Sequence, residues 1–428
     1  MKKLIALTAI AGMLVIAGGP ALTVAQEAST GLTRGSGGGT PPIIKAKWEM
    51  NGPCFTGNNN DVWDDCANVG SEHGSNTGEG ADDSTDPGAQ FNAPGEFESN
   101  MNYTICAIAT DPNGPDDIAG VYADIYYPEG ISYHPEDPDN PDQVGNNAGQ
   151  PNNPDYGLSA CGAFIEQNTL HKLDKEDGID LFCNQIRNNN NNLPEFYEFP
   201  SGSDFYDYDE ICGPTGELEK EEAHVYCDDK QLWYEWPAGD YRAEVIAQDA
   251  AGNSSTQNSN VGEDGVTANL FEYLPLTEFA VDFTSVNYGE VLLNTKKILS
   301  GDLDMTTSAR PTVRNLGNTR LYMWVAQDDM GLGQTSGNWN VSYEARLGNR
   351  SADWRSYDPF DFEGAGSPTF SGDYERLQDI LDLSEDEELD FSILVTKWPT
   401  TASDWNGDMW LTASQAAFRQ CNADTFPI

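Results

Sequence analysis

Residues 239–253 read GDYRAEVIAQDAAGN, and this stretch decides the fold class. Its residues Tyr241, Ala243, Val245 and Ala247 occupy every second position. Successive side chains of a β-strand point to opposite faces, so this period of two predicts a strand with one buried face. The closing letters DAAGN predict a turn directly after the strand.

The longer stretch GDYRAEVIAQDAAGNSS, residues 239–255, resembles the closing strand and turn of an immunoglobulin-like or cadherin-like sandwich. That resemblance implies antiparallel sheets packed face to face. It covers a short part of the chain, so the rest of the fold class depends on the other strand patterns.

Similar patterns recur along the chain. Residues 121–127 alternate, with Val121, Ala123 and Ile125 predicted on one face. Further strands are predicted at residues 41–48, 103–109, 279–283, 291–293, 311–314, 321–326, 389–395 and 405–411. Many short strands separated by Gly, Asn and Pro turns predict an all-β protein with two tandem immunoglobulin-like antiparallel β-sandwiches.

The domain boundaries follow from composition. The first sandwich is predicted over 42–272, with a long disulfide-braced insertion at about 131–232 and a loop at 55–100. Short helices are expected near 175–187 and 216–225 within the insertion. The second sandwich is predicted over 273–416, followed by a tail at 417–428.

The first 25 residues predict a secretory signal peptide. Lys2 and Lys3 precede an apolar run that ends at Gly18, and cleavage is expected after Ala25. An uncleaved membrane anchor is the alternative, but the run is shorter than the roughly 20 residues that span a bilayer. We therefore expect a secreted or cell-surface protein without membrane insertion, beginning with a Gly-rich linker at 26–41.

The chain is strongly acidic, with 70 Asp and Glu against 22 Lys and Arg in 428 residues. A formal net charge of −48 repels phosphates, which excludes nucleic acid as a partner. Self-repulsion of this size requires screening, by high salt or by divalent cations outside a cell. The sequence does not choose between the two.

An even number of cysteines in an exported chain favours disulfides over metal binding, because the spacings are long and no CxxC pair occurs. The four cysteines between Cys161 and Cys227 are expected to brace one local region, and Cys54 with Cys66 would close a short loop. The eight candidates are Cys54, Cys66, Cys106, Cys161, Cys183, Cys212, Cys227 and Cys421.

Calcium is the metal that the acidic loops favour, because hard cations prefer carboxylate and carbonyl oxygens. Asp174, Asp177 and Asp180 surround a glycine, although the spacing departs from an EF-hand. The remaining clusters are Asp137, Asp139 and Asp142, and Asp204, Asp207 and Asp209. The alternative is that all three are solvated acidic loops.

Four sequons predict glycosylation, at Asn102, Asn253, Asn340 and Asn349, with Asn253 the preferred site because it lies in a predicted turn. Two tryptophan groups suggest glycan binding as a hypothesis, because flat aromatic rings stack on sugars, but packing in a core or between domains is preferred. The two groups are Trp233, Tyr234 and Trp236, and Trp398, Trp405 and Trp410.

A wider resemblance comes from residues 281–331, VDFTSVNYGEVLLNTKKILSGDLDMTTSARPTVRNLGNTRLYMWVAQDDMG. With IKAKWEM at 44–50 and DFSILV at 390–395, this stretch is similar to a secreted archaeal family found mostly in methanogens. The resemblance implies extracellular sandwich domains of immunoglobulin type. It implies no catalytic residues.

Sequence motifs of enzymes are absent. The chain has no G-x-S-x-G, H-E-x-x-H or phosphate-binding glycine loop, and its four histidines, expected at the surface, are His73, His134, His171 and His224. We therefore expect a non-catalytic structural protein of the cell envelope, a filament or the matrix, associating with itself or with other surface proteins. A glycan- or protein-binding module and a secreted hydrolase are the alternatives. The Gly-rich linker would also allow the first strand to pair with a neighbouring molecule.

Overall fold

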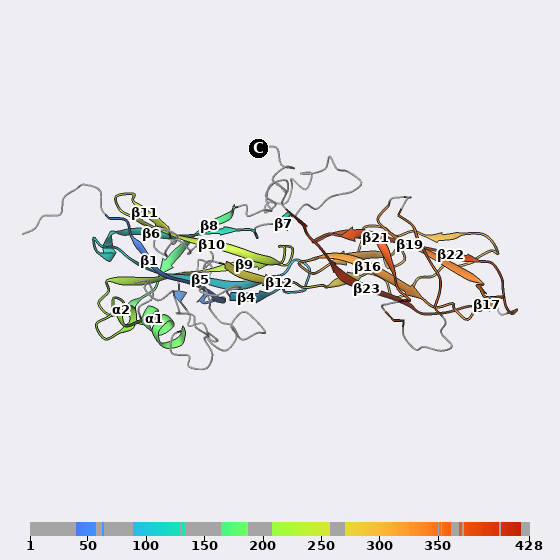
Figure 1. Ribbon diagram of the computed structural model, residues 1–428, viewed down its shortest axis with the longest axis horizontal. Helices are drawn as coiled ribbons and strands as arrows, with labels where there is room; N and C mark the ends of the chain where they lie inside the picture. Colours follow the sequence, from blue (N-terminus) through green and yellow to red (C-terminus); the bar gives the residue numbers. More distant parts are fainter. Residues whose placement is uncertain are drawn as a thin grey trace, which may run out of the picture. The chain divides into compact units, whose positions relative to one another are not determined.

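The computed structural model describes residues 40–56, 62–63, 89–128, 131–132, 164–186, 208–256, 270–349, 351, 353–360, 368–369, 372–401 and 404–420. The predicted signal peptide at 1–25 and most of the linker lie outside these ranges. The described residues are mostly β-strand, with a few short helices (Figure 1). None of the helices in the described ranges is long and apolar enough to cross a membrane.

The strands before residue 275 are β1 (Ile43–Asn51), β2 (Phe55–Thr56), β3 (Val62–Trp63), β4 (Ala89–Asn92), β5 (Asn100–Thr110), β6 (Ile118–Tyr126), β7 (Ile131–Ser132), β8 (Phe164–Lys172), β9 (Ala223–Trp233), β10 (Gly239–Asp249), β11 (Ser254–Thr256) and β12 (Leu270–Leu274). The helices are the 3-10 helix η1 (Pro115–Asp117), α1 (Lys175–Ile179), the π-helix η2 (Asp180–Ile186) and α2 (Tyr208–Cys212). The later strands are β13 (Phe279–Val281), β14 (Lys297–Leu299), β15 (Thr312–Asn315), β16 (Arg320–Gln327), β17 (Gln334–Thr335), β18 (Asn338–Trp339), β19 (Val341–Leu347), β20 (Arg355–Tyr357), β21 (Glu375–Leu381), β22 (Asp386–Val395), β23 (Met409–Ala416) and β24 (Arg419–Gln420).

Nine of the earlier strands form one sheet in the order β1-β5-β9-β8-β6-β10-β12-β4, with β11 beside β10. The pairs are antiparallel except for β12 with β4. Strand β8 connects the two halves of the sheet: it pairs with β6 from Phe164 to Leu170 and with β9 only at His171 and Lys172. The sheet is therefore divided at β8.

Strand β5 is buried on both faces, which explains its nearly continuous apolar sequence. Tyr103, Ile105 and Ala107 belong to a core shared with β6, β10 and β12. Cys106 and Ile108 belong to a second core, built with residues of β1, η2 and α2. The helical segments thus cover the outer face of β1 and β5.

A β-bulge in β1 decides which residues enter each core. The register against β5 shifts between Ile44 and Ala46. Ile44 therefore faces the first core while Trp48 faces the second. The shift places Lys47 opposite Ala107 and Glu49 opposite Ile105, on the side of the first core. Both charged side chains are fully buried, and Lys47 Nζ lies 2.5 Å from Glu49 Oε1.

The segment predicted as an insertion at 131–232 is not an excursion from the sheet. It contributes β8 and β9, which lie between β5 and β6. The helix predicted at 175–187 is present as α1 and η2, but the helix predicted at 216–225 is wrong, because turns occupy 216–222 and β9 begins at Ala223. The loop predicted at 55–100 contains β4, a strand of the main sheet.

The later strands form a six-stranded sheet, β13-β15-β22-β19-β20 with β14 beside β22, and a three-stranded sheet, β21-β16-β23. Both contribute to one hydrophobic core. Leu389, Phe391, Ile393 and Val395 are all buried, as their alternation predicted. The strand predicted at 291–293 is wrong: Asn294 has a φ of 52°, so extended backbone stops there and resumes in β14.

The first strand pairs within its own chain. Strand β1 forms an antiparallel ladder with β5 from Ile43 to Asn51, interrupted only by the bulge between Ile44 and Ala46. The apolar side chains of β1 contribute to both cores of the first sheet. The structure therefore accounts for this strand without exchange between molecules.

Candidate functional site

A polar hollow of about 350 Å³ opens where β8 separates from β9. We call it the tryptophan hollow, because two half-buried tryptophans, Trp233 and Trp236, line it. Its other lining residues are Pro53, Phe55, Asn102, Glu166, Asn168, Asp229, Lys230 and Gln231. Carboxylates, amides and an ammonium group thus surround two indole rings.

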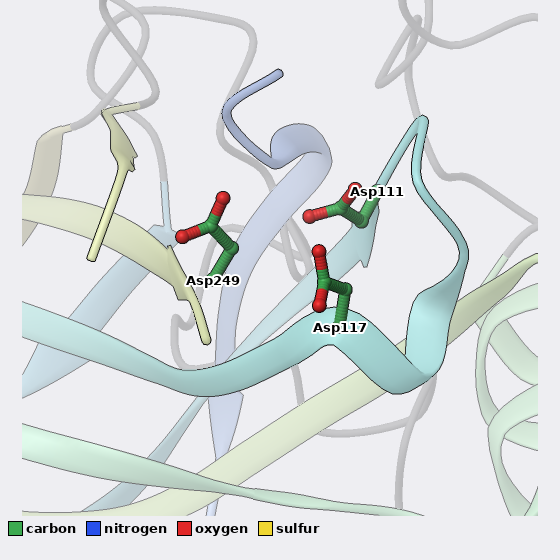
Figure 2. Close-up of side chains that lie close together, drawn as sticks. All are labelled: Asp111, Asp117 and Asp249. Carbon is green, nitrogen blue, oxygen red and sulfur yellow. The ribbon is translucent and has the colours of Figure 1, made fainter. Parts of the chain in front are cut away.

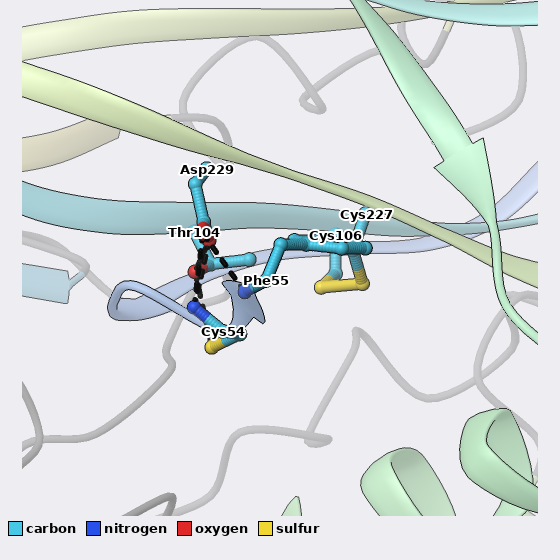
Figure 3. Close-up of a disulfide and its surroundings, with 6 residues drawn as sticks. All are labelled: Cys54, Phe55, Thr104, Cys106, Cys227 and Asp229. Carbon is cyan, nitrogen blue, oxygen red and sulfur yellow. Dashed lines mark hydrogen bonds between the residues drawn. A yellow bond between two sulfur atoms is a disulfide. The ribbon is translucent and has the colours of Figure 1, made fainter. Parts of the chain in front are cut away.

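Asp229 is held in place by the segment that follows β1. Its carboxylate accepts hydrogen bonds from the backbone N–H of Cys54 at 2.9 Å and of Phe55 at 2.9 Å (Figure 3). The hydroxyl of Thr104, on the neighbouring strand β5, donates to the same carboxylate at 2.5 Å. This wall of the hollow is therefore preorganised by hydrogen bonds to one carboxyl group.

The opposite wall comes from β8 and contains an unpaired amide. The Nδ2 group of Asn168 is buried and has no hydrogen-bond partner, whereas Glu166 lies two residues earlier on the same face. Burial raises the pKa of nearby Tyr103 well above its ordinary value, and the charges of Glu166, Glu49 and Asp228 raise it further. The tyrosine stays a neutral hydrogen-bonding group at physiological pH.

The second tryptophan group forms no comparable hollow among the described residues. Trp398 and Trp405 stack with ring centroids 6.1 Å apart, and Trp410 packs against Phe360 at 5.0 Å. Both members of the stacked pair pack against the core of the later sheets. Packing therefore explains this group. Trp236 also stacks on Tyr241, with ring centroids 6.0 Å apart, but both Trp236 and Trp233 line the hollow.

Two disulfides lie within the described residues, Cys106–Cys227 and Cys183–Cys212. The first joins residues directly opposite one another on β5 and β9 (Figure 3). The second joins η2 to α2 on the outer face of the sheet. Cys54 is also disulfide-bonded. Cys227 thus pairs with Cys106 and not within the predicted local group, while Cys66, Cys161 and Cys421 lie outside the described residues.

Of the predicted calcium clusters, the one at Asp174, Asp177 and Asp180 lies within the described ranges, and its ligand atoms do not converge. Asp174 precedes α1 and is exposed, and Asp180 Oδ1 accepts a hydrogen bond from Asn184 within the next helical turn. Asp177 is half-buried in α1. Asp137, Asp139 and Asp142 lie outside the described residues. Within the described ranges, the acids whose ligand atoms converge are instead Asp111, Asp117 and Asp249.

The sequence contains a signal for this triad, an aspartate at the start of a turn, which clusters of neighbouring acids do not reveal. Asp111 opens the turn DPNG, and Asp249 opens the turn DAAGN, so each acid lies where a strand ends. Their proximity depends on which strand ends share one edge of the sheet, which spacing along the chain does not reveal.

The sequons differ in accessibility. Asn349 is exposed, whereas Asn340 is buried and its amide donates to the carbonyl of Leu332 at 2.7 Å, so glycosylation of Asn340 is not compatible with this fold. The amide of Asn253 donates to Asp249 at 2.7 Å, and Asn102 is half-buried in β5.

The described histidines also differ. His171 is exposed as expected, but His224 is buried in β9, and this burial lowers its pKa. His73 and His134 lie outside the described residues. These two positions by themselves do not identify a catalytic site.

No protein-family model and no curated protein matches this sequence. Among solved structures, the C-terminal domain of the antigen I/II-family protein AspA of Streptococcus pyogenes is similar at 13% identity, over 79% of this chain and 96% of that one, with a TM-score of 0.18. The C-terminal domain of the antigen I/II polypeptide BspA of Streptococcus agalactiae aligns at 10% identity, over 78% and 95% of the two chains, also with a TM-score of 0.18. We draw no conclusion about fold or function from similarity at this level.

Proposed function

We propose that the chain is an exported, non-catalytic structural protein of the cell surface or the extracellular matrix. The observation that supports this most is the disulfide Cys106–Cys227 in the central strands, together with Cys183–Cys212. Such bonds persist in oxidising compartments and are rare in the cytosol. The net charge of −48 suits a protein that is screened by extracellular cations or salt.

Thiol alkylation tests the location. Protein from its native source would be alkylated before and after reduction and then digested for mass spectrometry. We expect Cys106, Cys227, Cys183 and Cys212 to be labelled only after reduction. Labelling of these cysteines in the unreduced protein would contradict an oxidising location.

Electron microscopy tests the structural role. The purified mature protein would be imaged in negative stain with calcium and with chelator. We expect ordered filaments or sheets in calcium that disperse in chelator, because divalent cations would bridge acidic surfaces. Dispersed monomers under both conditions would contradict self-assembly.

A second candidate function, glycan binding, is favoured by the tryptophan hollow. Trp233 and Trp236 offer ring faces, and Asn102, Glu166 and Gln231 offer hydrogen-bonding groups beside them. We expect Trp233→Ala to weaken binding to a glycan array by more than about tenfold. Trp410→Ala, in the other tryptophan group, is the matched control. Equal glycan binding by both variants would exclude the tryptophan hollow as a glycan-binding site.

A further inference from the structure

Three aspartates from separate segments meet at one edge of the first sheet. Asp111 follows β5, Asp117 ends η1, and Asp249 ends β10. One ligand oxygen from each lies within 4.8 Å of those from the other two. Figure 2 shows the carboxylates of Asp111 and Asp117 directed toward one another, with that of Asp249 beside them.

Strand pairing brings Asp249, the member of the triad that is distant in sequence, next to Asp117. Strands β6 and β10 run antiparallel, and their ladder ends with Asp249 opposite Ile118, the residue after Asp117. The register shifts between Gln248 and Asp249, because Ala119 of β6 has no partner on β10. The backbone N–H of Ala250 then donates to the carbonyl of Asp117 at 2.8 Å, which joins the two loops.

Hydrogen bonds fix the orientation of two carboxylates. Asp249 accepts the backbone N–H of Ala251 at 2.9 Å and of Asn253 at 2.7 Å, and also the side-chain amide of Asn253. These bonds involve both oxygens of Asp249 and hold its carboxylate in one orientation. Asp111 Oδ1 accepts the backbone N–H of Asn113 at 2.6 Å.

The other oxygen of Asp111 has no partner. Asp111 is 4% exposed, and its Oδ2 atom is buried without a hydrogen bond. A buried carboxylate oxygen is stable only when a hydrogen-bond donor or a cation compensates its lost hydration. This oxygen instead belongs to a carboxylate that faces a second one (Figure 2), and like charges so close disfavour each other.

We propose that Asp111, Asp117 and Asp249 bind one calcium ion, which ties the turn before β6 to the turn after β10. A cation would compensate the buried Asp111 oxygen and reverse the repulsion within the triad. Calcium fits better than magnesium because it tolerates irregular oxygen geometry and accepts backbone carbonyls and water as further ligands, whereas magnesium requires a near-ideal octahedron. A site with three carboxylates in an extracellular protein predicts a Kd on the order of 10⁻⁴ to 10⁻³ M.

The test is calorimetric titration of the full mature chain, stripped with chelator, with calcium chloride and separately with magnesium chloride. Because the surface is acidic throughout, the decisive readout is the difference between two isosteric variants. Asp111→Asn removes a ligand from the triad. Asp116→Asn removes the same charge from an exposed residue of the short helix η1, which follows Asp111 in the same loop.

We expect Asp116→Asn to keep the calcium affinity of the wild type. Asp111→Asn should weaken calcium binding by at least roughly 10- to 100-fold, because loss of even a group that supports a metal ligand costs that much. Equal calcium titrations for the two variants would overturn the proposal. So would binding of magnesium at this site as tightly as calcium.

Thermal unfolding separates binding from folding. In chelator, Asp111→Asn is expected to melt no lower than the wild type, because it removes a buried charge and keeps the Oδ1 acceptor. In calcium, the wild type and Asp116→Asn should rise in Tm, and Asp111→Asn should not. A lower Tm for Asp111→Asn in chelator, with an unchanged calcium increment, would show that the carboxylate is structural and overturn the proposal.

Two further measurements apply if Asp111→Asn does not fold. Asp117→Asn, at a half-buried position, should give the same loss of calcium binding. A crystal structure of the wild type grown in calcium should show the ion between the three carboxylates, and its absence there would overturn the proposal. A calcium-binding monomer would leave this inference standing while contradicting the proposed assembly.

Discussion

Arg346 and Asp390 lie directly opposite one another on β19 and β22, and Arg346 Nε donates to Asp390 Oδ2 at 2.6 Å. Nη2 of the same guanidinium lies 2.5 Å from that oxygen. The other carboxylate oxygen accepts the backbone N–H of Gly301 at 2.8 Å. The side chain of Asp390 is fully buried, so one acid holds two segments together inside the later sheets.

We expect Asp390→Asn to destabilise the chain by about 3 kcal/mol, because the mutation removes the nearest counter-charge of a largely buried guanidinium and leaves it, among the described residues, only Glu388, whose Oε1 lies 3.9 Å away. Urea denaturation of the full mature chain measures this change. The matched control is Asp386→Asn, whose carboxylate pairs with Arg314 at a more exposed position of β22 and should cost about 1 kcal/mol. Equal losses of stability in the two variants would show that burial of the ion pair does not determine its contribution to stability.

Close backbone packing leaves no room for a side chain at Gly301. A Cβ atom at this position would lie 2.2 Å from the carbonyl oxygen of Pro311 and 2.7 Å from the backbone nitrogen of Leu389. Neither backbone group can move without disturbing the sheet, so Gly301→Ala should cost at least about 1–3 kcal/mol in urea denaturation. Gly372→Ala, where a Cβ would meet nothing within 4 Å, should change stability by less than about 0.5 kcal/mol.

Glu385 should make stability depend on pH in an unusual direction. Burial raises its pKa well above the ordinary value, and the charges of Glu387 and Asp382 raise it further. A raised pKa in the folded state means that Glu385 favours folding below its unfolded pKa, about 4.3, and that this contribution is lost as the pH rises through the folded pKa.

Glu385→Gln should therefore raise the urea midpoint at pH 7.5 and leave it unchanged near pH 4. Glutamine keeps an oxygen to accept the backbone N–H of Asp382, which donates to Glu385 at 2.6 Å in the wild type. Glu278→Gln, at an exposed position, is the control and should shift the midpoint little at either pH. A loss of stability at pH 7.5 would contradict the predicted direction.

The two described disulfides should differ in their contribution to stability. Cys106 and Cys227 are 121 residues apart, whereas Cys183 and Cys212 are 29 apart. Closing a longer loop removes more entropy from the unfolded chain, so the Cys106→Ala and Cys227→Ala pair should cost about 5 kcal/mol. The Cys183→Ala and Cys212→Ala pair should cost about 1 kcal/mol less in the same urea series. The reverse order would show that local packing outweighs loop closure.

The alternating strands were predicted correctly because alternation is a local property of the backbone. Tyr241, Ala243, Val245 and Ala247 were predicted to face one core, and all four are fully buried. Strand β9 was missed because Asp228, Asp229 and Lys230 interrupt its apolar pattern. Asp228 pairs with Lys230 on the same strand, and Asp229 is accommodated by a tertiary contact, the backbone N–H groups of Cys54 and Phe55.

The sequence by itself determined the β-rich class, the inward faces of the long strands and the acidic, cysteine-containing composition of the chain. Only the tertiary structure decided that Cys106 faces Cys227 and that Asp249 meets Asp111 and Asp117. Local composition sets whether a strand forms, because side-chain alternation and turn chemistry act within a few residues. Which strand ends share an edge is set by the pairing of segments distant in sequence, and that pairing is where the candidate calcium site arises.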